Sequence, residues 1–224
     1  GRDVGFSQPD TFSSSQMLRV LLDTGEHRLL CQNEKPMLLD SVYGVAVSVS
    51  ASQEDAPHVD KLLAVLGEIG IPRSTSVRTQ TSDKSVADVL ADSVARFQLG
   101  QSELEWTAVA YSSYLPPSRS WVNRFGERFT FDDLADALLQ RPEGEGPCYG
   151  THVLYALNYL IRIDEACAVL EPVTVARIRQ RLQQASMNLE NAQYSTGAWS
   201  EDWHVPRGEA RSSLPEPPLA AKNI

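Results

Sequence analysis

The sequence predicts a mainly α-helical fold of paired antiparallel helices, with one small β-hairpin near residues 36–52. Two observations support this fold class. Apolar side chains recur at the three- and four-residue spacing of amphipathic helices in about six or seven stretches of roughly 10 to 20 residues. One stretch alternates instead, because small residues separate Tyr43, Val45, Val47 and Val49, and this is the pattern of a half-buried strand. Helix pairs joined by loops rich in Gly and Pro form bundles, solenoids or closed rings, and periodicity does not choose among them.

The N-terminal half contributes the first helices and the strand. Residues 1–10 have no apolar period and are expected to form a tail, and a helix is expected to run from Thr11 to Gly25. The strand is expected to pair with Leu38-Leu39 or with the run Thr75 to Thr79. A further helix is expected over residues 56–70, where Gly70 ends an apolar stripe formed by Val59, Leu62, Leu63, Leu66 and Ile69.

The second half predicts a series of helices. They are expected after Asp83, over residues 105–115, after a Thr130 cap, over residues 150–163 and after Glu171. A loop holding Trp121 and Asn123 is expected before Thr130. Residues 150–163 are apolar on nearly every side, so this helix is expected to lie at the centre of the packing. Residues 11–205 therefore predict a single helical domain, followed by a proline-rich strap over residues 206–224.

Charge excludes two classes of partner. The 224 residues include 20 Lys and Arg against 29 Asp and Glu, which gives a net charge of −9. Such a surface repels phosphate backbones and anionic membranes, so the partner is expected to be a protein or polymer other than nucleic acid. No apolar window of about 18 residues predicts insertion in a membrane, so the segment is expected to be soluble.

The two ends of the chain bear on its context. Because the chain starts at Gly1 and ends just after a proline-rich run, it is expected to be a piece of a longer protein. The sequence leaves the compartment open, and an exported or cell-envelope protein is one alternative.

The C-terminal part carries one motif that is specific to a family. Residues 193–199 read Gln-Tyr-Ser-Thr-Gly-Ala-Trp, and Ala185 and Leu189 precede the glutamine. This pattern resembles the QW repeat of the squalene-hopene cyclase and prenyltransferase superfamily, although Gln184 and Asn188 stand where a basic and an aromatic residue are usual. The resemblance covers roughly residues 146–203, and it implies an α/α toroid whose central funnel faces a ligand. Since a complete ring of the superfamily needs about twelve helices, this chain would form a partial ring.

Three further segments support the same likeness. Residues 105–107, 123–127 and 150–157 resemble bacterial proteins with toroid-type helical repeats, and no activity comes with that resemblance. The catalytic signatures of the two enzyme families are absent, because Asp132-Asp133 is the nearest acidic pair and falls at a helix start, where the helix dipole favours carboxylates.

Metal and cofactor binding are not expected. The cysteines, Cys31, Cys148 and Cys167, are far apart and form no CxxC pair. Cys148 and His152 are the metal candidates, but Gly146-Pro147 places Cys148 in a loop and a third ligand would have to come from Asp202 or His204.

Titratable and aromatic residues define the candidate site. The candidate acid and base groups are His152, Asp202 and Glu105. Aromatic faces stack on sugars, so the candidate ligand-binding residues are Trp106, Trp121, Tyr155, Trp199 and Trp203. Some of these have a structural alternative: His152 can satisfy loop carbonyls, and Trp199 and Trp203 can pack the end of the last helix pair.

Two functions therefore stand as hypotheses. The first is a non-catalytic helical module that binds a ligand or protein. The alternative is a toroid-type lyase, hydrolase or cyclase that acts on a glycan or isoprenoid-like substrate, with His152 and Asp202 or Glu105 as acid and base. An enzyme requires these groups to converge in one pocket, whereas a scaffold lets them point apart.

Overall fold

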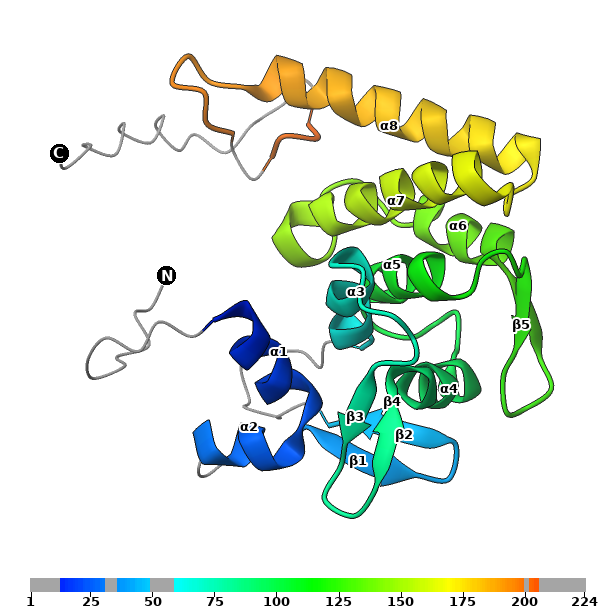
Figure 1. The fold of residues 1–224 in the computed structure, drawn as a ribbon. Helices are drawn as coiled ribbons and strands as arrows, with labels where there is room; N and C mark the ends of the chain where they lie inside the picture. The colour runs from blue at the N-terminus through cyan, green and yellow to red at the C-terminus, as the bar shows by residue number, and fades with distance from the viewer. Residues whose placement is uncertain (1–12, 31–35, 49–58, 200–201, 206–224) are drawn as a thin grey trace, which may run out of the picture.

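The computed structural model describes residues 13–30, 36–48, 59–199 and 202–205 (Figure 1). Within these ranges the chain forms eight α-helices: α1 (Ser14–Leu22), α2 (Thr24–Leu30), α3 (Lys61–Glu68), α4 (Val86–Arg96), α5 (Leu104–Tyr114), α6 (Phe131–Leu139), α7 (Thr151–Cys167) and α8 (Pro172–Ala192). Six short strands complete the fold: β1 (Leu38–Ser41), β2 (Gly44–Val47), β3 (Ser76–Arg78), β4 (Asp83–Ser85), β5 (Ser120–Val122) and β6 (Arg128–Thr130). The fold class is therefore mainly helical, as the sequence predicts.

The helices form successive layers with α5 at the centre. α5 packs against α3 on one side and α7 on the other, and α8 lies over α6 and α7 as the outermost layer (Figure 1). One hydrophobic cluster runs through these layers from Leu22 to Ile178. The prediction that residues 150–163 form the central helix is wrong, because Tyr155 on α7 is exposed while nine of the 11 residues of α5 are buried.

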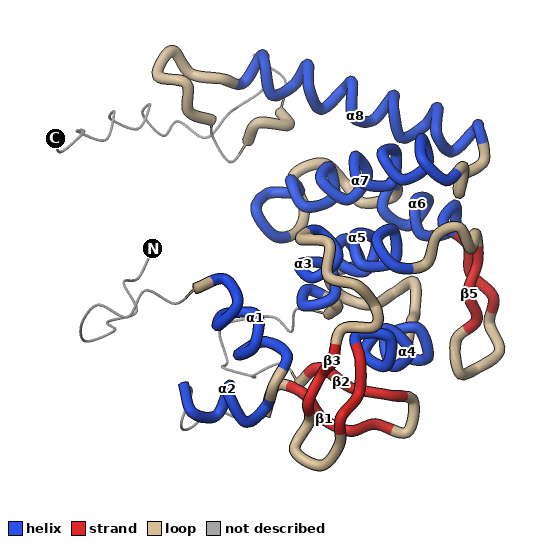
Figure 2. The backbone as a smooth tube through the Cα atoms, in the orientation of Figure 1, coloured by secondary structure: helices blue, strands red, loops and turns tan. Residues whose placement is uncertain are grey.

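Three antiparallel hairpins lie between consecutive helices of the chain. β1 pairs with β2, β3 with β4 and β5 with β6, in separate two-stranded sheets. Figure 2 shows the first two hairpins close together beside α4, and the third apart from them. The predicted pairing of the alternating stretch with Leu38-Leu39 is confirmed, since Leu38 lies opposite Val47. Residues 75–79 pair instead with β4, and the loop expected around Trp121 is a hairpin.

One supersecondary unit occurs twice in succession. A helix, a hairpin and a second helix follow each other as α3-β3-β4-α4 and again as α5-β5-β6-α6. In both units the hairpin begins with a serine and ends with a hydroxyl residue opposite it, Ser76 with Ser85 and Ser120 with Thr130. Ser85 and Thr130 are then the N-cap residues of the following helices, so each hairpin leads directly into a helix.

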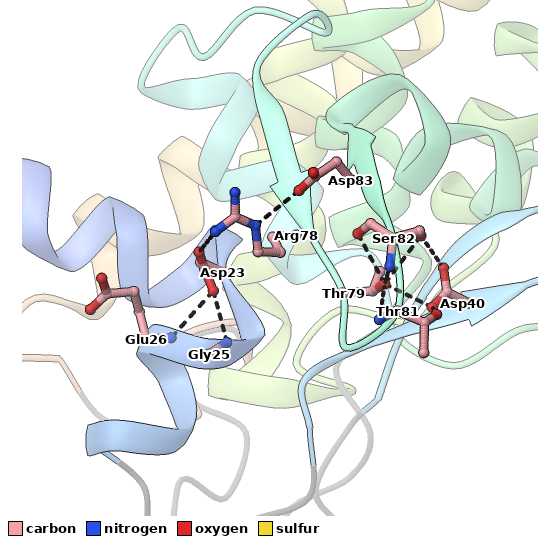
Figure 3. Close-up of polar contacts among 9 residues, drawn as sticks. All are labelled: Asp23, Gly25, Glu26, Asp40, Arg78, Thr79, Thr81, Ser82 and Asp83. Carbon is pink, nitrogen blue, oxygen red and sulfur yellow. Dashed lines mark hydrogen bonds and ion pairs between the residues drawn. The ribbon is translucent and has the colours of Figure 1, made fainter.

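The N-terminal helices are tied to the first unit by carboxylates (Figure 3). Asp40 accepts hydrogen bonds from the hydroxyl groups of Thr79, Thr81 and Ser82, and these bonds lower the pKa of Asp40 to about 2. Arg78 pairs with Asp83 at 2.9 Å and with Asp23 at 3.5 Å. The hairpin β3-β4 is therefore held from both sides, by β1 and by the junction of α1 and α2.

Two helix boundaries differ from the prediction. Gly25 does not end the first helix, because Asp23 interrupts it and its carboxylate accepts from the backbone N–H groups of Gly25 and Glu26, which starts α2. The helix expected over residues 56–70 begins only at Lys61. The N-terminal tail, the C-terminal strap and the first part of that helix lie outside the described residues. No helix in the described ranges has the length and apolar character needed to cross a bilayer.

Candidate functional site

A pocket lies between strand β2, helix α4 and the N-terminal end of α3. Its volume is about 410 Å³, which is within the usual size of small-molecule sites. The apolar part of its wall consists of Val45, Ala46, Val47, Val59 and Val89, and the polar part consists of Asp60, Asp92, Ser93, Arg96, Gln98 and Gln101. An apolar wall with a few convergent polar groups is typical of a binding site.

Asp60 occupies a strained position in this pocket. Its backbone has φ 58° and ψ 5°, in the left-handed region that residues with a side chain rarely adopt. It occupies the N-cap position of α3, yet its side chain makes no capping hydrogen bond. The carboxylate accepts instead from the Thr107 hydroxyl on α5, at 2.6 Å. Strain of this kind costs of order 1–3 kcal/mol and is concentrated at functional sites.

A chain of neutral hydrogen-bond donors supports the Asp60 carboxylate. Gln101 donates to the Thr107 hydroxyl at 2.7 Å, and Thr107 donates in turn to Asp60. Burial raises the pKa of Asp60 above its usual value, the hydrogen bonds from Thr107, Ser93 and Gln101 oppose this rise, and the charge of Asp92 adds to it. Among the described residues, no cation lies within ion-pair distance of Asp60.

The second carboxylate of the pocket is neutralised by the protein itself. Asp92 is 4% exposed, and the Arg96 Nε lies 3.0 Å from one of its oxygens and 2.9 Å from the other. The Ser41 hydroxyl donates to Asp92 and accepts from Arg96 at 3.1 Å. The Arg96 guanidinium also lies 5.9 Å from the centre of the Tyr43 ring. These contacts fix Arg96 on Asp92, so Arg96 does not serve as a positive partner of the Asp60 carboxylate.

The pocket is connected to the aromatic core through Ser93. The Ser93 and Tyr111 hydroxyl groups lie 3.0 Å apart, and Tyr111 is fully buried against Phe97 and Trp121. Burial raises the pKa of Tyr111 well above its usual value, and the nearby charge of Asp60 adds to this effect. Tyr111 therefore stays neutral and serves as a fixed hydrogen-bonding group behind the pocket wall.

Two of the predicted acid and base groups, Glu105 and His152, lie elsewhere, near the start of α5 and of α7. Glu105 is 1% exposed and pairs with Arg141 at 2.7 Å. The Trp106 and His152 rings are in contact, with centres 5.0 Å apart, and the Lys61 Nζ lies 5.6 Å from the centre of the Trp106 ring. Three buried atoms of this region have no hydrogen-bond partner among the described residues: Glu105 Oε1, Trp106 Nε1 and His152 Nδ1.

The other predicted residues are distributed over the surface and the core. Trp121 is buried among Phe97, Tyr111, Phe129 and Phe131. Trp203 is buried against the end of α8, and its indole N–H donates to the Tyr149 carbonyl at 3.0 Å. Asp202 is half-buried, and Tyr155 and Trp199 are exposed. The structure brings Trp106 and His152 into contact, and it places Trp121 in the core.

The Gln-Gly-Trp motif closes the C-terminal end of α8. The Gln193 amide donates to the Gly197 carbonyl at 3.0 Å, Gly197 has φ 86°, and the Trp199 indole donates to the Leu189 carbonyl at 2.8 Å. Each of these three residues therefore stabilises the turn after the helix.

The metal candidates are also apart from the pocket. Cys148 is exposed in the 3₁₀ turn Pro147–Gly150, with φ 51° and ψ 39°, and His152 lies on α7. No three His, Cys, Asp or Glu side chains within the described ranges are placed to hold a metal ion.

No protein-family model, curated protein or solved structure matches this chain. The likeness to the cyclase and prenyltransferase repeat therefore stays a prediction, and the functional argument depends on the geometry of the pocket.

Sequence reasoning missed Asp60 and the residues around it. Asp60 was expected inside a helix, where an exposed carboxylate would need no explanation. A signal was present, since Asp60 directly precedes the apolar run that begins at Leu62, and aspartate is common at helix starts. The contribution of Thr107, which lies on another helix, carries no local signal.

Proposed function

We propose that this protein is a non-catalytic helical module that binds a small molecule in the pocket beside Asp60. One observation carries the proposal: a half-buried carboxylate, in left-handed backbone geometry, lines a pocket of about 410 Å³ without a cationic partner among the described residues. A protein gains no stability from such an arrangement, because burial of an unpaired carboxylate is unfavourable. Its retention is explained if a ligand completes the site.

Binding is favoured over catalysis by the contents of the pocket. Among the described residues that line it there is no His, Cys, Lys or Tyr, and its second carboxylate is paired with Arg96. General acid and base catalysis needs two groups with different proton affinities beside the substrate, and Asp60 would have no second group to work with.

A blocking substitution tests the proposal. Ala46 lines the pocket on β2, so Ala46→Phe should fill it, whereas Ala91→Phe places the same ring on the exposed face of α4. A thermal-shift screen of small amines, alcohols, carboxylates and sugars should yield a compound that stabilises the wild type and the Ala91→Phe variant but not Ala46→Phe. A ligand present at about 100 times its dissociation constant should raise the free energy of unfolding by about 2.7 kcal/mol. The proposal fails if no such compound stabilises the wild type, or if Ala46→Phe responds equally.

The catalytic alternative also has a specific observation in its favour. Glu105, Trp106 and His152 each bury a polar atom that has no partner within the described part of the chain, and such atoms often mark a site for water or a ligand. If these residues form an active site for a glycan or isoprenoid-like substrate, His152→Ala should abolish turnover and leave binding at the Asp60 pocket unchanged. Turnover that survives in His152→Ala would remove this alternative.

A further inference from the structure

We infer that the pocket takes the ammonium group of a small amine, with the Asp60 carboxylate as its counter-ion. This inference rests on the function proposed above, and it adds the chemical class of the ligand. It begins with the charges that line the pocket, which are those of Asp60, Asp92 and Arg96. Because Arg96 contacts both oxygens of Asp92, the described part of the lining carries one uncompensated negative charge when Asp60 is ionised.

The charged groups near Asp60 do not supply that charge. Lys61 follows it in the chain, but its Nζ lies against the Trp106 ring. The Tyr111 phenol, behind Ser93, stays neutral. The adjoining residues 49–58 include Glu54, Asp55 and His58 but no Lys or Arg. No side chain in the described part of the chain therefore supplies a cation to Asp60, and a positively charged ligand would complete the pair.

The hydrogen-bonding capacity of the carboxylate supports an ammonium partner. An ionised carboxylate can accept about four hydrogen bonds, and the donors that Asp60 has are neutral side chains, with Thr107 at 2.6 Å as the closest. An ammonium group brings three donors and a full charge to the same oxygens. Folding has already removed water from the Asp60 carboxylate. Binding of an ammonium group therefore adds electrostatic attraction without a further cost for desolvating that carboxylate.

The apolar wall indicates the rest of the ligand. Val45, Val47, Val59 and Val89 offer branched aliphatic surfaces beside the carboxylate, and these suit a short hydrocarbon body. Pentylammonium has both parts, and 1-pentanol has the same chain with a neutral head. The two compounds therefore separate the contribution of the charge from that of the apolar wall.

The test compares these two probes on the full chain. Binding is followed through the backbone amide signals of Val45, Val47 and Val89. At neutral pH, pentylammonium should bind at least about tenfold more tightly than 1-pentanol, a difference of about 1.4 kcal/mol. On the wild type, the affinity for pentylammonium should rise as the pH increases from 3.8 through the raised pKa of Asp60, while the affinity for 1-pentanol stays constant.

Two variants complete the experiment. Asp60→Asn should remove the preference for the amine, and Asp83→Asn, the same change at an exposed carboxylate on the hairpin β3-β4, should keep it. Equal affinity for the two probes, or a preference that survives in Asp60→Asn, would overturn the inference and leave the pocket as a binding site. Absence of binding by both probes would count against the inference and the proposed function together. The pH series on the wild type needs no variant, so a folding defect in Asp60→Asn does not decide the result.

Discussion

The two helix-hairpin-helix units share one backbone plan but use different side chains to hold their hairpins. In the first unit, Thr79 accepts at its hydroxyl from the backbone of Thr81 and Ser82 and donates to Asp40. In the second, Asn123 accepts at its side-chain oxygen from the backbone of Phe125 and Glu127 and donates to the Phe97 carbonyl. Each hairpin loop is thus closed by one buried polar side chain.

The units differ most in the middle of the hairpin. Val77 of β3 and Trp121 of β5 are both buried and occupy the same position in the repeated unit. Trp121 packs on four aromatic rings, whereas the hairpin β3-β4 is held at its rim by carboxylates. In the first unit it is the helix α4 after the hairpin that lines the pocket. The same architecture is therefore stabilised by aromatic packing in the second unit and leaves space for a ligand beside α4 in the first unit.

The largest loss of stability is expected in the hairpin β5-β6, which aromatic packing holds in place. Trp121→Ala removes an indole from a close-packed aromatic cluster and should lower the free energy of unfolding by about 3–5 kcal/mol. Val77→Ala, at the matching position of the first unit, should cost about 2 kcal/mol because less apolar surface is lost. Urea denaturation at neutral pH measures both. Equal losses would show that the two hairpins are held in the same way.

The Asp60 carboxyl in the pocket predicts that the stability of the protein depends on pH. Because the pKa of Asp60 is raised on folding, the folded state binds a proton more tightly than the unfolded state. The stability that the protonated Asp60 carboxyl contributes to the folded state is therefore lost as the pH rises from about 3.8 through the pKa that Asp60 has in the folded protein. Asp60→Asn should not show this loss, so its stability relative to the wild type should increase with pH. A constant difference from pH 3 to 8 would contradict the prediction.

The two helix starts that follow the hairpins allow a smaller test. The Thr130 hydroxyl accepts from the Asp133 N–H at 3.2 Å, and Asp133 accepts from the Thr130 N–H at 2.8 Å, so the cap of α6 is reciprocal. Thr130→Ala should cost about 1 kcal/mol. An exposed change at the other end of the same helix, Gln140→Ala, serves as the reference in chemical denaturation. A loss no greater than that of the reference would show that the cap contributes nothing.

The smallest effect concerns the hairpin rim. Because the pKa of Asp40 is lowered to about 2, Asp40 contributes stability that is present above the unfolded pKa of 3.8 and is lost as the pH falls towards 2. Asp40→Asn should lower the melting temperature slightly at neutral pH and should flatten its acid dependence over that window. An unchanged acid dependence would argue that the three hydroxyl contacts are not maintained in solution.

The sequence predicts the helical class well and the small strands poorly, for physical reasons. Apolar period and capping chemistry are local, so the helix after Thr130 begins where it is expected. Strands of three residues, such as β3 and β5, are too short to show alternation. The candidate site is harder still, because the environment of Asp60 depends on Thr107 and Ser93, which lie on two other helices.

The repeated unit also left a signal in the sequence. Ser85 and Thr130 are each followed three residues later by an aspartate, Asp88 and Asp133, at the start of an apolar helix. The shared pattern is short and the intervening hairpins have unlike cores, so the two copies share few side chains.

The most direct test of the central claim is the titration of the aspartate carboxyl carbons by nuclear magnetic resonance, which reads Asp60 and Asp40 in one sample. We expect the Asp60 carboxyl to titrate with a pKa above its usual value of 3.8, and the Asp40 carboxyl to titrate with a pKa of about 2. We further expect saturation with pentylammonium to lower the pKa of Asp60, because the ammonium group stabilises the ionised form. An Asp60 carboxyl that titrates at or below 3.8 in the free protein would contradict the claim that this group is enclosed without a cationic partner.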